Sequence, residues 1–214
     1  MKQAPITPDR APRRADTADA LLRAGRALFA HHGYDGASVR AITDSAGANL
    51  GAITYHFGSK RNLYGAVLRE CIAPLAERIR AAVASPAPPL ERVEAVVRAY
   101  FRYMLDTPEL PRLLMQELVM GREPADEVAA AIRPVLGALR GVVLEGQADG
   151  TIREGDPALM AMSIVSQPLH MILGQRLLAK VAGVELRDPE TRERLMAHAA
   201  RFARNGLASG REGQ

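Results

Sequence analysis

The chain has 214 residues, which suits one large helical domain or a small domain and a larger one. Apolar residues make up 48% of the chain, enough for a hydrophobic core, and no apolar run approaches the roughly 18 residues of a membrane span. The formal net charge of +4 lies entirely in residues 1–64, which hold nine Lys and Arg against five Asp and Glu. This asymmetry favours a polyanion as the partner of the N-terminal end, although a solvated basic tail would give the same sum.

The N-terminal segment is rich in proline and arginine. Residues 1–15 lack the apolar core of a secretory signal, so we expect them to form a flexible basic arm. An amphipathic helix is predicted over 16–33, and Gly33 and Gly36 bracket the turn that follows it. The single cysteine, Cys71, cannot form an intrachain disulfide, which favours a cytoplasmic location.

Two short helices joined by a glycine are predicted after this turn. Ser38 can cap the first helix with its hydroxyl, and Gly47 can end it in the left-handed conformation. Asn49 can cap the second helix, which we expect to end at Phe57. This pattern is typical of the helix-turn-helix, with an ordinary helical hairpin as the alternative. Together with the preceding helix, the pair predicts a three-helix DNA-binding domain over 16–60.

The sequence TYHFGSK, at residues 54–60, closes the second short helix. It resembles the signature of the tetracycline-repressor (TetR) family, in which aromatic residues close the recognition helix and a lysine opens the fourth helix. The likeness covers residues 18–68, and the longer string GANLGAITYHFGSKRNLY is similar to that of CecR-like regulators. Thr54 departs from the commonest family pattern, which has tyrosine there, and its shorter side chain reaches less far toward a phosphate.

The resemblance implies individual roles in binding DNA. Arg40 matches a position that reads a base edge, and guanine is the usual target of such an arginine. Leu50, Gly51 and Ala52 match positions that face bases, where their small or apolar surfaces would sense thymine methyl groups and DNA shape. The positions that match phosphate contacts are Ser38, Thr54, Tyr55, His56 and Lys60.

Beyond Lys60 we predict only helices, because prolines and glycines divide the chain into long helical segments and no strand pattern appears. The expected helices span 60–84, 90–106, 109–121, 125–148, 156–182 and 188–207. The first of these runs without a linker into a larger domain over 61–208, and residues 209–214 would form a disordered tail. The predicted fold class is therefore all-α: an N-terminal helix-turn-helix domain joined by a fourth helix to a helical ligand-binding and dimerisation domain.

The helix expected over 156–182 is apolar on more than one face, and its small residues allow close approach by another helix. A central core helix in a monomer is one explanation, and a face shared with a second subunit is the one we favour. TetR-family proteins are similar, because they dimerise through a four-helix bundle made from their last two long helices. A two-fold homodimer would present two recognition helices about 34–36 Å apart to a palindromic operator.

Methionines are frequent in the later helices, and their flexible side chains adapt to irregular apolar shapes. Plain core packing is the commoner reason for such a pattern, but polar residues on the same helices could supply the few convergent groups that a ligand pocket needs. The candidate pocket residues for a small-molecule effector are Met104, Met115, Gln116, Gln167, His170 and Met171.

The sequence contains no dinucleotide-binding, phosphate-loop or metalloprotease motif, and its five histidines have no ligand spacing on one helix. We therefore expect no catalytic residues, no cofactor and no metal. The favoured function is a ligand-responsive transcriptional regulator, specifically a repressor that a small molecule releases from DNA. Two alternatives stay open, namely an all-helical protein-binding module and a helical enzyme with a basic head.

Overall fold

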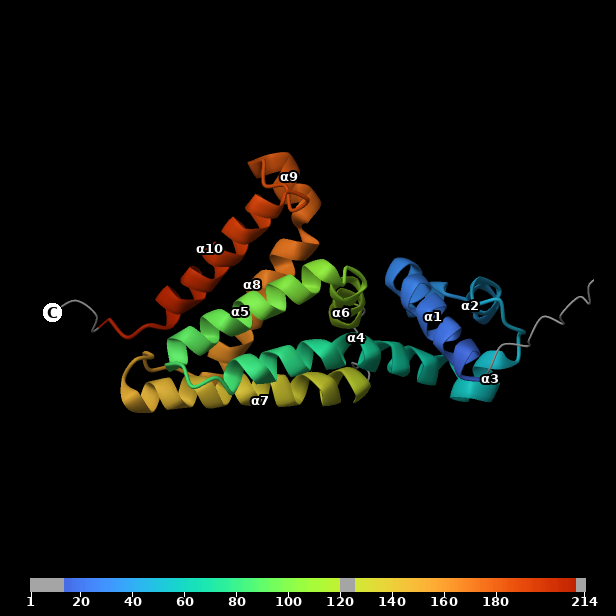
Figure 1. Cartoon of the computed structure of the whole chain (residues 1–214), viewed down its shortest axis with the longest axis horizontal. Coiled ribbons are helices and arrows are strands. Elements are labelled where there is room, and N and C mark those ends of the chain that lie inside the picture. Colours follow the sequence, from blue (N-terminus) through green and yellow to red (C-terminus); the bar gives the residue numbers. More distant parts are fainter. Residues whose placement is uncertain (1–13, 120–125, 211–214) are drawn as a thin grey trace, which may run out of the picture. The chain divides into compact units, whose positions relative to one another are not determined.

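The computed structural model describes residues 14–119 and 126–210. Within them the chain forms helices joined by short turns, and no strand is present (Figure 1). The helices are α1 (Arg14–Gly36), α2 (Val39–Ser45), α3 (Ala52–Phe57), α4 (Lys60–Val83), α5 (Pro89–Asp106), α6 (Glu109–Val119), α7 (Asp126–Asp149), α8 (Pro157–Leu173), α9 (Gln175–Ala182) and α10 (Pro189–Leu207). The predicted all-α class is therefore confirmed.

Two predictions, the N-terminal arm and the C-terminal tail, concern the ends of the chain. Most of the expected arm over 1–15 and of the expected tail over 209–214 lies outside the described residues. Arg14 and Ala15 already belong to α1, which therefore begins slightly earlier than predicted. At the other end of α1, Gly33 adopts φ 76° and ψ 171°, a conformation that breaks the helix where the turn was expected.

The helix predicted over 156–182 is in fact two helices. Gly174 separates α8 from α9, and the two axes are bent by 70°. Glycine inside a helix is costly because it loses the most backbone freedom on ordering, so an apolar run that contains Gly174 is more easily interrupted there than elsewhere. Within the described residues no single helix is long and apolar enough to cross a membrane, and only this bent pair reaches that length and apolarity together.

The chain divides into two compact units, Met1–Val67 and Leu68–Gln214. In the first unit, α1, α2, α3 and the first turns of α4 surround one apolar core. Its large apolar side chains that are fully buried include Leu21, Phe29, Ile42, Ile53, Leu63 and Val67. A side chain of this size contributes roughly 1.5–3 kcal/mol when it leaves water. Because the start of α4 contributes to this core, the first unit extends past the predicted boundary at residue 60.

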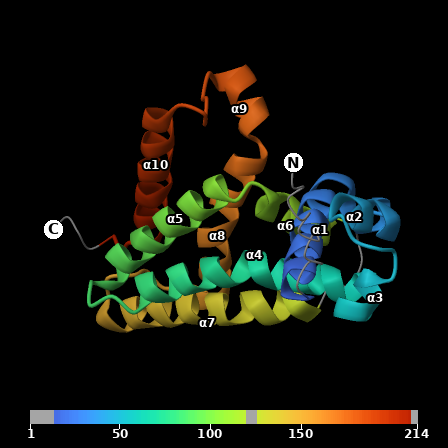
Figure 2. The same ribbon diagram turned by 45° about the vertical axis from the view of Figure 1, so that its right-hand side comes forward.

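In the second unit α5 packs against α7, α8 and α10, as Figures 1 and 2 show from two directions. Helix α5 has a broad apolar face, and Val93, Val96, Phe101 and Met104 on it are fully buried. Helix α8 also contacts α6 and α10. The unit is thus built around α5 and α8, with the remaining helices packed on them.

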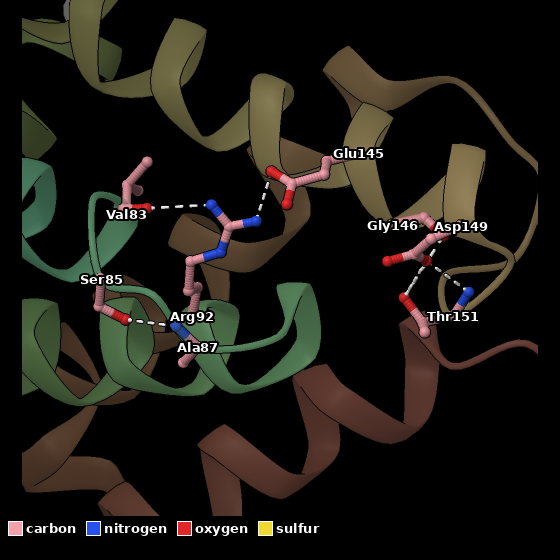
Figure 3. A network of polar contacts seen from close by, with 8 residues as sticks. All are labelled: Val83, Ser85, Ala87, Arg92, Glu145, Gly146, Asp149 and Thr151. Atoms are coloured by element: carbon pink, nitrogen blue, oxygen red, sulfur yellow. Dashed lines mark hydrogen bonds and ion pairs between the residues drawn. The ribbon is translucent and has the colours of Figure 1, made fainter.

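A polar network joins three helices of the second unit (Figure 3). Arg92 of α5 donates from Nη1 to the carbonyl oxygen of Val83, the last residue of α4, at 3.2 Å. Its Nη2 pairs with the carboxylate of Glu145 on α7. At the end of α7, Asp149 accepts from the hydroxyl and the backbone N–H of Thr151 at 2.6 and 2.9 Å, and these bonds lower the pKa of its carboxyl.

Candidate DNA-binding site

Two hydroxyl side chains, one at the start of α2 and one within it, form hydrogen bonds with the backbone of the same helix. Ser38 caps the helix, and its Oγ accepts from the N–H of Ala41 at 3.0 Å. The buried hydroxyl of Thr43 donates to the carbonyl oxygens of Val39 and Arg40 at 3.1 and 3.0 Å. Ile42 and Thr43 are buried on the inner face of α2, whereas Arg40 and Asp44 are exposed on its outer face.

The outer surface of α2 and α3 carries several predicted DNA contacts. The Arg40 side chain is 84% exposed, and its Nε lies 3.8 Å from Oδ2 of Asp44, one helical turn away. Leu50 and Tyr55 are 62% and 66% exposed, which is unusual for large apolar or aromatic side chains. Ser38, Gly51 and Thr54 are exposed as well, and His56 is half-buried with its ring edge-on to Tyr55.

One of the predicted base-facing residues lies on the wrong side of α3. Ala52 is only 5% exposed and packs in the core of the first unit beside Ile53. Helix α3 has six residues, and both of these occupy its inner face at the first turn. The burial of Ala52 does not favour contact between its methyl group and bases, so we leave it out of the proposed base contacts. Leu50 and Gly51, which precede the helix, are the exposed residues of that group.

The corner between α3 and α4 depends on one glycine and two polar side chains. Gly58 adopts φ 78°, which an L-residue rarely tolerates, and its N–H donates to the carbonyl oxygen of Thr54 at 3.0 Å. Asn62 donates from Nδ2 to the carbonyl oxygen of Phe57 at 2.9 Å, while Ser59 Oγ accepts from the N–H of Asn62 at 3.1 Å. Asn62, which closes the end of α3, was not among the predicted site residues.

Lys60, at the first position of α4, is half-buried rather than extended into solvent. Its Nζ lies 4.5 Å from the centroid of the Tyr34 ring, within the range of a cation–π contact. Burial lowers the pKa of the Lys60 ammonium, and the nearby charge of Asp35 opposes that shift. Tyr34 was not predicted as part of the site, and the one available signal was an aromatic residue directly after the turn glycine.

The six predicted pocket residues do not all lie together. Met104 is fully buried on α5, whereas Met115, Gln116 and Met171 are half-buried on α6 and α8, two helices that contact each other. His170 is exposed, and its Nδ1 lies 2.9 Å from the carbonyl oxygen of Ser166. His170 therefore lies apart from the buried residues of the group, and its role in binding a ligand stays a prediction.

The rotation of α8 about its axis explains why Gln167 and His170 do not lie with the buried residues of that helix. The buried residues of α8 form one stripe, namely Met160, Ala161, Ile164, Pro168, Leu169 and Ile172. Gln167 and His170 lie off this stripe. Gln167 instead lines a surface groove of about 360 Å³ between α8 and α10, together with Leu159, Ser163 and Phe202. Among the described residues no cluster of His, Cys, Asp and Glu side chains is arranged to hold a metal ion.

An all-helical chain whose first unit presents an exposed helix-turn-helix belongs to the class of helix-turn-helix regulatory proteins. Residues 21–67 match the family model of bacterial regulatory proteins of the tetR family, and residues 89–202 match that of the tetracyclin repressor-like C-terminal domain. The chain therefore belongs to the TetR family. The narrower likeness to CecR-like regulators stays a prediction.

Named repressors are among the similar proteins. The HTH-type transcriptional repressor AcnR of Corynebacterium glutamicum is 47% identical over 57 residues, which is 27% of this chain and 30% of AcnR. The chain thus matches only about three tenths of that relative's length. The HTH-type transcriptional repressor NicS of Pseudomonas putida is 24% identical over 198 residues, covering 89% of this chain and 92% of NicS.

Solved structures of the family show the same fold. The ketosteroid transcriptional regulator KstR2 of Mycobacterium tuberculosis aligns with a TM-score of 0.69 at 21% identity, over 95% of this chain and 99% of that chain. The TetR family transcriptional regulator PfmR from Thermus thermophilus aligns with a TM-score of 0.71 at 22% identity, over 96% and 100% of the two chains.

Proposed function

We propose that this protein is a transcriptional repressor that binds a palindromic DNA operator as a homodimer and leaves it when a small molecule binds the second unit. The observation that carries this proposal is the exposed surface of the helix-turn-helix, where Arg40, Leu50 and Tyr55 extend into solvent. The excess of positive charge in residues 1–64 supports a polyanionic partner for this unit. A transcriptional regulator that binds DNA would act in the cytoplasm.

The contacts fall into two kinds. Arg40 would read a base edge, and Leu50 and Gly51 would contact thymine methyl groups and sense groove shape. Thr54, Tyr55, His56 and Lys60 would hold phosphates and so fix the register of the protein on the duplex. Ser38 would join them, because its Oγ accepts from a backbone N–H and can still donate its own proton to a phosphate.

The groove between α8 and α10 supports a homodimer. Leu159 and Phe202 are large, apolar and exposed side chains that line this groove, and exposed apolar patches mark protein–protein contacts. Phe202→Glu should give a monomer in sedimentation equilibrium, whereas Phe202→Leu, which keeps the face apolar, should stay dimeric. A dimeric Phe202→Glu protein would place the subunit contact elsewhere.

The interior of the second unit is our proposed effector site. Met104, Met115, Gln116 and Met171 come from α5, α6 and α8 and would suit an apolar molecule with few polar groups. Because α4 runs from Lys60 to Val83, an effector that favours one position of α4 would alter the DNA-binding end. By linkage, operator DNA must then weaken effector binding by the same factor.

A mobility-shift assay with the DNA that flanks the protein's own gene tests the proposal. We expect a shift of fragments that contain one palindromic segment, with an affinity that falls steeply as salt increases. Lys60→Ala should weaken binding to every sequence and reduce the salt slope by about one. Binding that shows no preference for any segment would count against a repressor. Chemical turnover of a bound effector would instead indicate an enzyme.

A further inference from the structure

Three aromatic rings contact one another in the first unit. The centroid of the Phe29 ring lies 5.0 Å from that of Tyr64 and 6.0 Å from that of Tyr34, and the Tyr34 and Tyr64 centroids are 5.2 Å apart. Phe29 and Tyr64 are buried, so they fix the Tyr34 ring from two sides. Gly33, with φ 76°, breaks α1 directly before Tyr34 and lets the chain turn there.

The ammonium of Lys60 lies over this fixed ring. Its Nζ is 4.5 Å from the centroid of Tyr34, and the lysine backbone is itself held at the corner set by Gly58 and Asn62. Both partners of the contact are thus anchored independently of any DNA. A free lysine side chain has one of the largest rotamer entropies of any residue, and a contact made before binding removes part of that cost.

We propose that Tyr34 is a positioning residue, whose ring holds the Lys60 ammonium in place for a DNA phosphate. This inference rests on the proposed function, because it needs Lys60 to contact the DNA backbone. The ring leaves part of the ammonium free, since a cation–π contact uses one face of the cation and no acceptor atom. Tyr34 would not touch DNA; it would act through Lys60 alone.

The charges around Lys60 agree with this role. Burial against the first unit lowers the pKa of Lys60, so its ammonium is less well solvated than that of an ordinary lysine. A DNA phosphate would supply an opposite charge. Because the Lys60 ammonium is already partly dehydrated, it would lose little further hydration on binding that phosphate. Asp35 opposes the lowering of the pKa and helps to keep the side chain charged before DNA arrives.

A double-mutant cycle tests the inference. The variants are Tyr34→Leu, which removes the ring, Tyr34→Phe, which keeps it, and each change combined with Lys60→Ala, all measured as dissociation constants on one operator duplex. Tyr34→Leu frees the Lys60 side chain, and the cost of ordering one such side chain on binding corresponds to about two- to ten-fold weaker binding. We expect that weakening for Tyr34→Leu in the wild-type background, none for Tyr34→Phe, and none for either change when Lys60 is already alanine.

The outcomes distinguish failure of the inference about Tyr34 from failure of the proposed contact between Lys60 and DNA. If Lys60→Ala weakens binding but Tyr34→Leu weakens it equally in both backgrounds, or strengthens it, Tyr34 does not act through Lys60 and only the inference is overturned. If Lys60→Ala changes neither affinity nor salt slope, the proposed phosphate contact fails and the inference fails with it.

A measurement on the DNA-free protein is the control for variants that fail to fold. The Tyr34 ring should shift the Lys60 side-chain proton resonances upfield in the free protein. This shift should survive in Tyr34→Phe and vanish in Tyr34→Leu. An identical spectrum for Lys60 in Tyr34→Leu and the wild type would overturn the contact itself.

Discussion

Arg92 holds the end of α4, because its Nη1 donates to the carbonyl oxygen of Val83 at 3.2 Å. The Arg92 side chain is only 11% exposed, whereas its carboxylate partner, Glu145, is 58% exposed (Figure 3). A charge in such a position is stable only while it is paired, since water cannot solvate it fully. The pair therefore matters more for stability than an ion pair at the surface.

We expect Glu145→Gln to lower the free energy of unfolding by about 1–3 kcal/mol, because the nearly buried Arg92 loses its counter-charge. Because Glu145 is partly exposed, this loss of unfolding free energy should be smaller than the loss from breaking a fully buried pair. Glu77→Gln is the matched control, because Glu77 and its partner Arg80 are both largely exposed. It should cost less than about 1 kcal/mol. Urea unfolding of both variants measures the difference, and equal costs would contradict the argument.

Gly58→Ala should destabilise the first unit by about 1–3 kcal/mol, the usual cost of a non-glycine residue at positive φ. The backbone there has φ 78°, and an added Cβ would meet Asn62 Nδ2 at 3.3 Å. Gly51→Ala is the control, since Gly51 has φ −79° and an added Cβ would meet only Asn49 Oδ1 at 3.6 Å. Thermal unfolding of the two variants should differ clearly.

Arg40→Ala should relax the specificity of DNA binding. If Arg40 reads a base edge, its loss removes roughly 1–3 kcal/mol of discrimination at one base pair of each half-site. The measurement compares the affinities of the variant for the operator and for duplexes changed at single positions. Lys60→Ala provides the contrast, because it should weaken all duplexes alike. A uniform loss for Arg40→Ala would show that this arginine contacts only phosphate.

Acid should destabilise the start of α10 through Asp188. The hydroxyl and the backbone N–H of Thr191 donate to its Oδ2 at 2.7 and 2.8 Å, and these bonds lower the pKa of Asp188. A carboxyl with a lowered folded pKa binds fewer protons than in the unfolded chain. Its contribution to stability is therefore complete above the unfolded pKa, near 4, and is lost as the pH falls through the folded pKa.

Thr191→Val removes the hydroxyl and brings the folded pKa of Asp188 closer to its unfolded value. We expect a smaller contribution at neutral pH and a shallower loss of stability below about pH 4. Thr191→Ser keeps the hydroxyl and should behave like the wild type. Free energies of unfolding measured from pH 2 to 7 test this, and a steeper acid loss in Thr191→Val would contradict the assignment.

Several helix starts were predictable because a proline marks them. Pro89, Pro157 and Pro189 each start a helix near the expected position, because proline fits the first turn and cannot continue a preceding helix. The break at Gly174 was not predicted. An apolar sequence around a single glycine is compatible with one long helix or two, and tertiary packing decides between them.

The site was predictable as a segment but not residue by residue. The signature at 54–60 identified the family, whereas the burial of Ala52 depends on the rotation of a six-residue helix. An error of one position in helix phase moves a side chain by about 100°. The contact between Tyr34 and Lys60 joins residues that lie far apart in the sequence, and no local pattern reveals such a pair.

Helix α4 is not mechanically uniform along its length. Pro74 lies inside it, and proline has no N–H to donate to the carbonyl oxygen four residues earlier, which belongs to Glu70. That turn of the helix lacks one of the bonds that resist bending, so it is softer than the turns on either side. A displacement applied near Val83, where Arg92 holds the helix, would therefore be absorbed partly at Pro74 before it reached Lys60.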